Sequence, residues 1–231
     1  MLTEYVEKIL KARVYDVAIE SPLEQMPRLS HRMGNTFWLK REDLQPIFSF
    51  KLRGAYNRMC HLSDEERLKG VVAASAGNHA QGVGLSAQKL SVSALIVMPT
   101  TTPPIKVQAV KDFGAEVVLF GDSYDEAYEK AAVIAAEQGR TFIHPYDDPE
   151  VIAGQGTVAM EIIRQHNDPF DAVFIPVGGG GLIAGMAAYI KTFWPDVKVI
   201  GVEPVDAASL HDALKADERI ILDQVGLFAD G

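Results

Sequence analysis

The sequence predicts an α/β fold with mainly parallel sheets, because short apolar runs alternate with helical segments from about residue 70 onward. The runs are nearly continuous in apolar residues, which is typical of parallel strands covered on both faces. The predicted strands are 71–74, 93–97, 116–120, 172–175 and 197–202. Strands that alternate with helices in this way imply right-handed crossovers between parallel neighbours.

Two of the segments between strands carry clear helix signals. Ser123 and Glu126 have the spacing of a capping box, and Gly139 is placed to end that helix. Its apolar stripe consists of Tyr124, Ala127, Tyr128, Ala131 and Ala135. A second stripe, which ends at Gly114, consists of Ile105, Ala109, Val110 and Phe113. Both helices are therefore predicted to pack an apolar face on the sheet.

Composition narrows the class of protein. The 231 residues are 48% hydrophobic and 23% charged, with a formal net charge of −9, as in an ordinary soluble globular protein. Without a concentrated positive field we expect no nucleic-acid or membrane partner, and no apolar stretch approaches the ~18 residues of a membrane span. No signal peptide is visible, and Cys60 is the only cysteine, so we expect no internal disulfide and a cytoplasmic location.

Lys51 is the first candidate for chemistry. It stands in the segment 49–55 (SFKLRGA), where a loop enters a predicted helix. The positive end of the helix dipole and the nearby Arg53 both disfavour protonation of its amine. A lysine with a lowered pKa is what Schiff-base chemistry requires, because the free amine attacks the aldehyde. Taken alone, however, the segment fits a solvated surface lysine better.

A second candidate is the segment 75–82 (SAGNHAQG), which follows the strand ending at Ala74 and begins with the turn 75–79. A small-residue turn that runs into a helix exposes backbone N–H groups at the positive helix end, where a carboxylate or phosphate binds. Asn78 adds a side chain that both donates and accepts hydrogen bonds, and His79 is interpreted as orienting the turn. A plain strand-to-helix turn with an Asn cap remains an alternative.

Four consecutive glycines, Gly178, Gly179, Gly180 and Gly181, connect a predicted strand to a predicted helix. Such a run costs much backbone entropy, and its usual reason is that main-chain amides wrap closely around an anion such as a phosphate. The same stretch also satisfies a loose dinucleotide-binding pattern, with Ala184 as its last small residue and Glu203 after the next strand. That pattern leaves the first two candidate segments without a role.

Other chemistries lack support in the sequence. The six histidines do not have the spacing of a metal site, and one cysteine cannot complete a zinc site, so no metal is predicted. The motifs of serine hydrolases and of P-loop proteins are also absent.

Taken together, SFKLRGA at 49–55, SAGNHAQG at 75–82 and PVGGGGLIAG at 176–185 resemble the serine/threonine dehydratase branch of the fold-type II pyridoxal-5′-phosphate (PLP) enzymes. Their order and spacing match, and the similarity covers nearly the whole chain. The segment 40–51 (KREDLQPIFSFK) and the ending 226–231 (GLFADG) are similar to biosynthetic threonine dehydratases in particular. The resemblance implies a two-lobed fold like that of the tryptophan synthase β subunit. Residues 1–67 and 147–231 would form a larger PLP-binding lobe, and residues 68–146 a smaller α/β lobe.

The resemblance also implies a role for each candidate residue. Lys51 would carry the cofactor as a Schiff base and later remove the substrate Cα proton, while Phe50 would pack on the cofactor ring. Asn78 would bond the 3-oxygen of the ring, and Gly178–Gly181 with Leu182 would hold the phosphate. The substrate carboxylate would be received by Ser75, Gly77, Asn78 and His79.

The implied reaction is the dehydration and deamination of L-threonine to 2-oxobutanoate and ammonia, the first step of isoleucine biosynthesis, with L-serine as a second substrate. Serine racemases of this branch tend to carry a second serine where this chain has Ala76, and that hydroxyl protonates the opposite face of Cα. Ala76 has no proton to give. We therefore expect elimination without appreciable racemisation.

Catalytic domains of this family run to more than three hundred residues, so the larger lobe is expected to be incomplete at its C-terminus. A sheet shortened in this way leaves an edge and an apolar face uncovered. We therefore expect a homo-oligomer, or a partner that supplies the missing C-terminal segment. Two other functions stay open at this point: a non-catalytic or partner-dependent remnant of the PLP lobe, and a nicotinamide-dependent dehydrogenase that uses the glycine loop.

Overall fold

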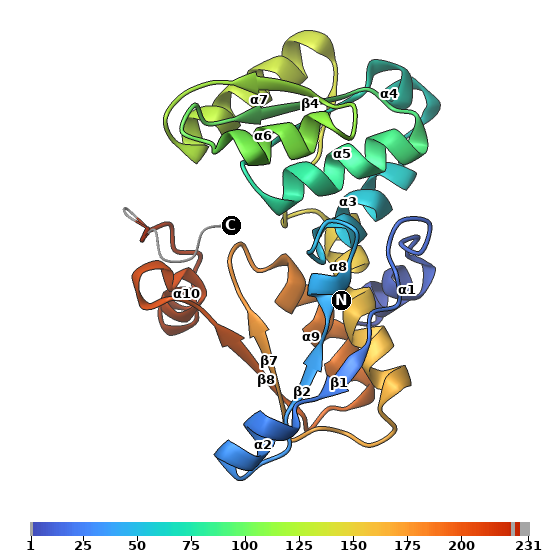
Figure 1. Ribbon diagram of the computed structural model, residues 1–231, viewed down its shortest axis with the longest axis vertical. Coiled ribbons are helices and arrows are strands. Elements are labelled where there is room, and N and C mark those ends of the chain that lie inside the picture. Colours follow the sequence, from blue (N-terminus) through green and yellow to red (C-terminus); the bar gives the residue numbers. More distant parts are fainter. Residues whose placement is uncertain (1, 223–224, 227–231) are drawn as a thin grey trace.

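The computed structural model describes residues 2–222, 225 and 226. Most of the ending 226–231, one of the segments that resembles threonine dehydratases, therefore lies outside the described residues. A four-stranded parallel sheet with the order β5-β4-β3-β6 forms one part of the molecule (Figure 1). Its strands are β3 (Val71–Ala74), β4 (Ala94–Met98), β5 (Glu116–Leu119) and β6 (Thr141–Phe142). The first three confirm predicted strands, whereas the two-residue β6 was not predicted.

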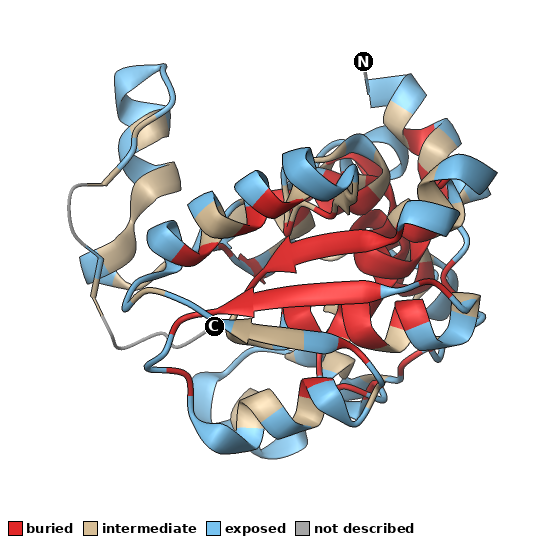
Figure 2. Ribbon diagram, turned by 90° about the horizontal axis from the view of Figure 1, so that it is seen from above, coloured by how far each residue is buried: buried red, intermediate tan, exposed pale blue. Residues whose placement is uncertain are grey.

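Helices cover both faces of this sheet, as the apolar strands predicted. Alternate residues of β3 and β4 face opposite sides of the sheet. Ile96 and Met98 pack with α5 (Asn78–Leu90) and α6 (Pro104–Lys111). Leu95 and Val97 pack on the other side with α7 (Tyr124–Gln138). Figure 2 shows the central strands as a buried layer between these helices.

The two helix predictions in this part had different outcomes. The capping box is present, with Ser123 accepting from the Glu126 amide and the Glu126 side chain bonding back, and Gly139 ends α7 in the left-handed region. The second stripe is wrong at Ile105, which is 79% exposed. Val110 is the buried residue of α6, and Ile105 precedes it by five positions, which places the two roughly 140° apart around the helix.

The other part of the molecule is built on packed helices and two small sheets (Figure 1). Its longer helices are α1 (Leu2–Lys11), α3 (Lys51–Cys60), α8 (Pro149–Gln165) and α9 (Gly181–Phe193). β1 (Leu23–Gln25) pairs antiparallel with β2 (Trp38–Lys40), and β7 (Ala172–Pro176) pairs parallel with β8 (Lys198–Val202). The remaining elements of this part are α2 (Pro27–Met33), η1 (Glu42–Leu44), η2 (Val205–Ala207) and α10 (Ser209–Ala216), whereas the short α4 (Asp64–Lys69) lies with the four-stranded sheet (Figure 1). β7 and β8 confirm the last two predicted strands.

Glycines let α3, α8 and α9 approach one another closely. A Cβ atom on Gly154 of α8 would lie 2.6 Å from the Arg53 carbonyl oxygen of α3. A Cβ atom on Gly185 of α9 would lie 2.3 Å from the Ile152 carbonyl oxygen of α8. No side chain fits at either contact, so backbone packs against backbone. This contact fixes the N-terminal ends of α3 and α9 relative to α8.

The strands of the second part leave apolar side chains exposed. Phe174 of β7 is 63% exposed and Val202 of β8 is 50% exposed. Among the described residues, β7 has β8 as its only neighbour in the sheet. No described helix combines the length and the apolar character needed to cross a membrane.

Candidate active site

Lys51 is the first residue of α3, directly after Phe50, and its amine faces the loop that joins β6 to α8. Nζ donates a hydrogen bond of 3.1 Å to the Pro145 carbonyl oxygen and lies 5.6 Å from the centre of the Phe50 ring. The side chain is half-buried, and burial lowers the pKa of the amine to about 8. Lys51 is therefore not an ordinary solvated lysine, and much more of its amine is free at neutral pH.

Arg53 does not lower this pKa, contrary to the expectation from the sequence. Its guanidinium is fully buried and forms ion pairs with Glu42 and Glu161, so its charge is neutralised away from the amine. Burial of Lys51 itself is the cause of the lowered pKa. The sequence therefore predicted the direction of the pKa shift of Lys51 correctly, but it attributed the shift to the wrong cause.

The turn after β3 is built as predicted, except for its cap. The Gly77 amide donates to Ser75 Oγ at 3.2 Å, and Ser75 is buried. Gly77, not Asn78, is the N-cap of α5, and no side chain caps this helix end. Asn78 is exposed, and its side chain makes no hydrogen bond within the described part of the chain. The alternative of an Asn-capped turn is therefore wrong, and the amides at the start of α5 are available to an anion.

His79 holds this turn to Ile143, the residue that follows β6. Its Nε2 donates a 2.9 Å hydrogen bond to the Ile143 carbonyl oxygen, and its pKa is lowered to about 3, first by burial and then by the charge of Lys51. The ring is therefore neutral, with the proton on Nε2. Its Nδ1 atom is buried and has no partner among the described residues. A buried acceptor of this kind is normally satisfied, so it marks a place for a hydrogen-bond donor.

The glycine loop lies between β7 and α9, where the sequence predicted it. Gly180 has a φ of 88° and is the N-cap of α9, again without a side-chain cap. A Cβ atom on Gly179 would lie 2.1 Å from the Tyr146 ring, whereas one on Gly178 or Gly180 would meet nothing within 4 Å. The loop thus presents bare amides to open space at the positive end of a helix, which suits a phosphate. Leu182 follows in the first turn of α9.

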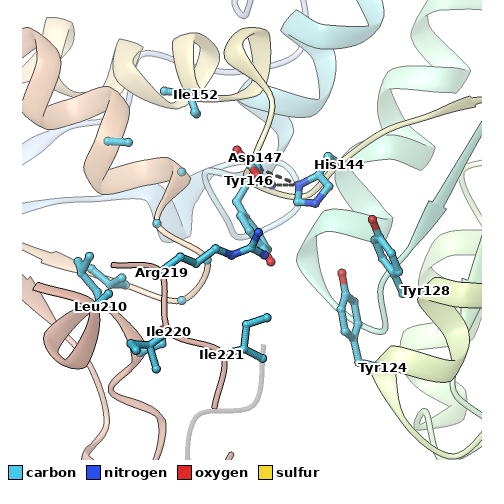
Figure 3. A pocket seen from close by; sticks show the side chains of 18 of the residues that line it. Tyr124, Tyr128, His144, Tyr146, Asp147, Ile152, Leu210, Arg219, Ile220 and Ile221 are labelled. Carbon is cyan, nitrogen blue, oxygen red and sulfur yellow. Dashed lines mark hydrogen bonds between the residues drawn. The ribbon is translucent and has the colours of Figure 1, made fainter. Parts of the chain in front are cut away.

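The glycine loop lines a cavity of about 690 Å³. Figure 3 shows Tyr124 and Tyr128 of α7 on one side of this cavity and Leu210, Arg219, Ile220 and Ile221 on the other. Lys51 and the residues 75–79 are not among its lining residues. The segment 143–146 connects these residues to the glycine loop. The carbonyl oxygens of Ile143 and Pro145 accept from His79 and Lys51, and the Tyr146 ring packs on Gly179. The structure therefore brings all three predicted segments around one loop.

Sequence reasoning missed the aromatic wall of the cavity. His144 Nδ1 accepts from the amides of Tyr146 (3.3 Å) and Asp147 (2.8 Å), and burial lowers the pKa of this imidazole. The two donors keep Nδ1 unprotonated, so the proton of the neutral ring is on Nε2. The segment 144–148 (HPYDD) has no sequence motif that marks it as part of a site. Its last residue, Asp148, caps α8 and pairs with Arg58 at 3.0 Å.

The dinucleotide alternative loses its acidic residue in the structure. Glu203 accepts from the amides of Leu210 and His211, both at 2.9 Å, and so holds the start of α10. A ribose would have to displace these bonds. In the part of the chain that the structure describes, no three His, Cys, Asp or Glu side chains gather as a metal site would require.

Comparison with known proteins decides between the remaining chemistries. The family model described as "Pyridoxal-phosphate dependent enzyme" matches residues 14–231. The chain belongs to this family. PLP is therefore the cofactor for which the residues must be tested, and the bare amides of the glycine loop fit its phosphate.

Individual relatives of this PLP-family chain agree with the resemblance. The biosynthetic chloroplastic threonine dehydratase of Arabidopsis thaliana is 62% identical over 99% of this chain, and the biosynthetic L-threonine dehydratase of Burkholderia multivorans is 55% identical over 99%. The processed form of threonine deaminase isoform 2 from Solanum lycopersicum has the same fold with a TM-score of 0.96 and 56% identity over 99% of this chain. Maize serine racemase follows with a TM-score of 0.92 and 31% identity over 96%.

The chain spans less than half the length of these curated relatives. It covers 38% of the Arabidopsis protein and 46% of the Burkholderia protein. It covers 66% of the tomato deaminase chain and 68% of the maize racemase chain in the solved structures. The predicted fold-type II architecture is thus confirmed, and so is its truncation relative to the full-length relatives.

Proposed function

We propose that this chain carries the PLP site of a threonine ammonia-lyase, which converts L-threonine to 2-oxobutanoate and ammonia and accepts L-serine as a second substrate. The observation that carries the proposal is the Lys51 amine, whose pKa is lowered to about 8 by burial beside the loop that also contacts the glycine loop. The names of the threonine dehydratases and of the tomato threonine deaminase support this substrate. The reaction would be the first step of isoleucine biosynthesis.

The residues of the chain divide the work between attachment, binding and proton transfer. Bound PLP supplies the electron sink that makes the Cα proton of an amino acid removable. Lys51 attaches the cofactor, and its free amine later removes that proton. Phe50 packs beside the ring and Asn78 bonds the ring 3-oxygen. Gly178–Gly181 and Leu182 hold the phosphate through their amides.

The substrate carboxylate is assigned to the turn after β3. Its uncapped amides lie at the positive end of the thirteen-residue α5, which favours an anion. The residues of this subsite are Ser75, Gly77, Asn78 and His79. His79 contributes through the main chain and through its place against Ile143. Since its ring is neutral, it adds no charge to the subsite.

The test is release of ammonia and 2-oxobutanoate from L-threonine by the 231-residue chain supplied with PLP. We expect activity in the wild type and in Lys111→Ala, which removes an exposed lysine at the end of α6, and none in Lys51→Ala. Full activity in Lys51→Ala would overturn the mechanism. Binding of PLP at Lys51 without product release would instead favour the partner-dependent remnant.

The same proposal predicts elimination rather than racemisation. Ala76 lies between Ser75 and Gly77 in the carboxylate turn and carries no proton for the opposite face of Cα. We expect ammonia from L-serine with little D-serine, and an increase in D-serine for Ala76→Ser. Formation of D-serine by the wild type at a rate near that of ammonia release would contradict the expectation. Chiral chromatography of one reaction mixture measures both products.

We also propose a division into two lobes, residues 1–67 with 147–231 and residues 68–146. The separate sheet within 71–142 supports this division.

The exposed Phe174 and Val202 support association of the chain, either as a homo-oligomer or with a C-terminal partner segment. A cytoplasmic location remains part of the proposal; the Arabidopsis relative is named chloroplastic and the yeast relative mitochondrial. Analytical ultracentrifugation measures the state of association directly.

A further inference from the structure

We propose that Arg53 is a positioning residue for Lys51: it locks the first turn of α3 to α8 and to the turn η1, and so fixes the Lys51 amine against the Pro145 carbonyl. The inference rests on the proposed role of Lys51. Arg53 would act through the place of the amine, since its own charge is neutralised by two carboxylates.

The bonds of Arg53 leave it no freedom. Nε and Nη2 donate to the two oxygens of Glu42, both at 2.8 Å. Nη1 donates to Glu161 at 2.6 Å and to Thr157 Oγ1 at 3.0 Å, and Nη2 also reaches Glu161 at 3.0 Å and the Ile19 carbonyl at 3.2 Å. A planar guanidinium bound on two edges by carboxylates holds one orientation. The side chain is completely buried, so water does not compete for these bonds.

The carboxylates are themselves fixed by further partners. Lys40 Nζ pairs with Glu161 at 2.6 Å, and the Tyr15 hydroxyl donates to Glu161 at 2.9 Å. Burial alone raises the pKa of Glu161, but hydrogen bonds from Arg53 and Lys40 outweigh it and hold that pKa below its ordinary value. Glu161 is therefore ionised, and the cluster contains two positive side chains and two negative ones. A neutral, fully bonded cluster is a rigid anchor rather than a source of field.

Arg53 and Lys51 project from different sides of α3. Arg53 follows Lys51 by two residues, which places the two side chains roughly 200° apart around α3. One therefore points into the protein while the other faces the loop 143–146. Glu161 and Thr157 belong to α8, and the loop that receives the amine leads directly into α8. Holding α3 on α8 thus sets the distance between Lys51 Nζ and the Pro145 carbonyl.

A residue that only stabilised the fold would change the melting temperature and leave the amine as it is. The distinguishing readout is the pH at which Lys51 becomes reactive, measured by labelling the PLP-free 231-residue chain with an amine reagent and mapping the labelled peptide. In the wild type the midpoint is expected near the pKa of about 8. The second readout is the dissociation constant of PLP from the reconstituted chain.

The variants separate orientation from charge. Arg53→Lys keeps the positive charge but cannot bridge both carboxylates. We expect it to raise the Lys51 midpoint and to weaken PLP binding by about tenfold or more, because small displacements of a reacting group carry large costs. Should Arg53→Lys fail to fold, the quadruple variant Lys40→Met/Arg53→Met/Glu42→Gln/Glu161→Gln removes the four charges together and tests the same point. The matched control is Arg164→Met, which lies on α8 like Glu161 and breaks an exposed pair with Glu20.

The outcomes are separable. A raised midpoint and weaker PLP binding in the Arg53 variants, with Arg164→Met unchanged, support the proposal. Variants with a wild-type midpoint and PLP affinity within twofold of wild type, whatever their melting temperature, overturn it. Should the wild-type chain fail to hold PLP on Lys51, the proposed function fails, while the labelling midpoint still decides whether Arg53 places the amine.

Discussion

Two strand–turn–helix units supply the proposed binding turns, and they are supported in different ways. The turn after β3 and the turn after β7 both lead into an uncapped helix of thirteen residues. Every residue of β3 is buried, and β3 lies between β4 and β6. In β7 only Ile175 is buried, and its only described neighbour in the sheet is β8. The first turn therefore follows a central, buried strand of the four-stranded sheet.

The second turn depends on side contacts instead. Its glycine loop is placed by α9 packing on α8 through Gly185 and by the Tyr146 ring against Gly179. The two turns proposed to bind anions are thus placed in different ways, one through strand pairing and the other through helix packing. Among the described residues, strand pairing therefore supports the first turn and helix packing supports the second.

The largest expected effect concerns Lys51, since its amine contacts the segment shared by both turns. With a pKa of about 8 in place of the ordinary 10.5, the free amine fraction at neutral pH is about 300-fold larger. Burial disfavours the charged form of Lys51, and this lowers the free energy of unfolding. The destabilisation is present below about pH 8 and disappears as the pH rises toward 10.5. Labelling each lysine as a function of pH measures the midpoint. A midpoint for Lys51 equal to that of the exposed Lys111 would contradict the account.

Gly185→Ala is expected to separate the two turns most clearly. The new Cβ would lie 2.3 Å from a backbone oxygen of α8 and 2.8 Å from the Gly156 amide, so α9 must move. We expect the free energy of unfolding to fall by about 3 kcal/mol. Denaturation monitored by the fluorescence of the buried Trp194 measures this loss. Hydrogen exchange should rise in 178–182 and stay unchanged in 75–80. Equal increases in both turns would show that they are not supported independently.

A smaller change tests the glycine loop itself. Gly179→Ala places a methyl group 2.1 Å from the Tyr146 ring, which has to shift and costs about 1–3 kcal/mol. PLP affinity should fall accordingly, by roughly tenfold or more. Gly84→Ala in α5 is the control, because its methyl group would lie 3.2 Å from the Phe113 side chain, away from the glycine loop. Equal losses of PLP affinity in both variants would show that the contact with Tyr146 does not place the loop.

The smallest expected loss of stability concerns the helix caps in the part that holds the four-stranded sheet. Ser123→Ala removes the capping box of α7 and should cost about 1 kcal/mol of unfolding free energy. Ser63→Ala, in the same motif at the start of α4, should cost a similar amount. Neither should change the labelling midpoint of Lys51. Urea denaturation measures both losses, and a change in that midpoint would mean that the sheet and the site are coupled.

Local signals made much of the fold predictable. The strands β3, β4, β5, β7 and β8, the capping box at Ser123 and the helix that begins at Lys51 all follow from residues close in sequence, whereas the short β1, β2 and β6 were not predicted. Long-range contacts were not predictable. Arg53 was expected near the Lys51 amine, but its partner Glu161 comes from 108 positions away in the chain. Nothing in the pattern of Ile105 revealed which side of its short helix would be buried.

The candidate site shows the same limit. Lys51, the turn 75–79 and the glycine loop were all visible as motifs, because each carries unusual local chemistry. What joins them is the segment 143–146, whose carbonyls and Tyr146 ring contact residues far away in sequence. An ordinary backbone carbonyl such as that of Pro145 has no signature in a sequence.

The most direct test of the central claim is the place at which the cofactor attaches. The 231-residue chain is mixed with PLP, reduced with borohydride, digested and analysed by mass spectrometry. The account predicts one phosphopyridoxyl group, on Lys51, and none on that peptide in Lys51→Ala. Attachment to another lysine, or no attachment to the wild-type chain, would contradict it.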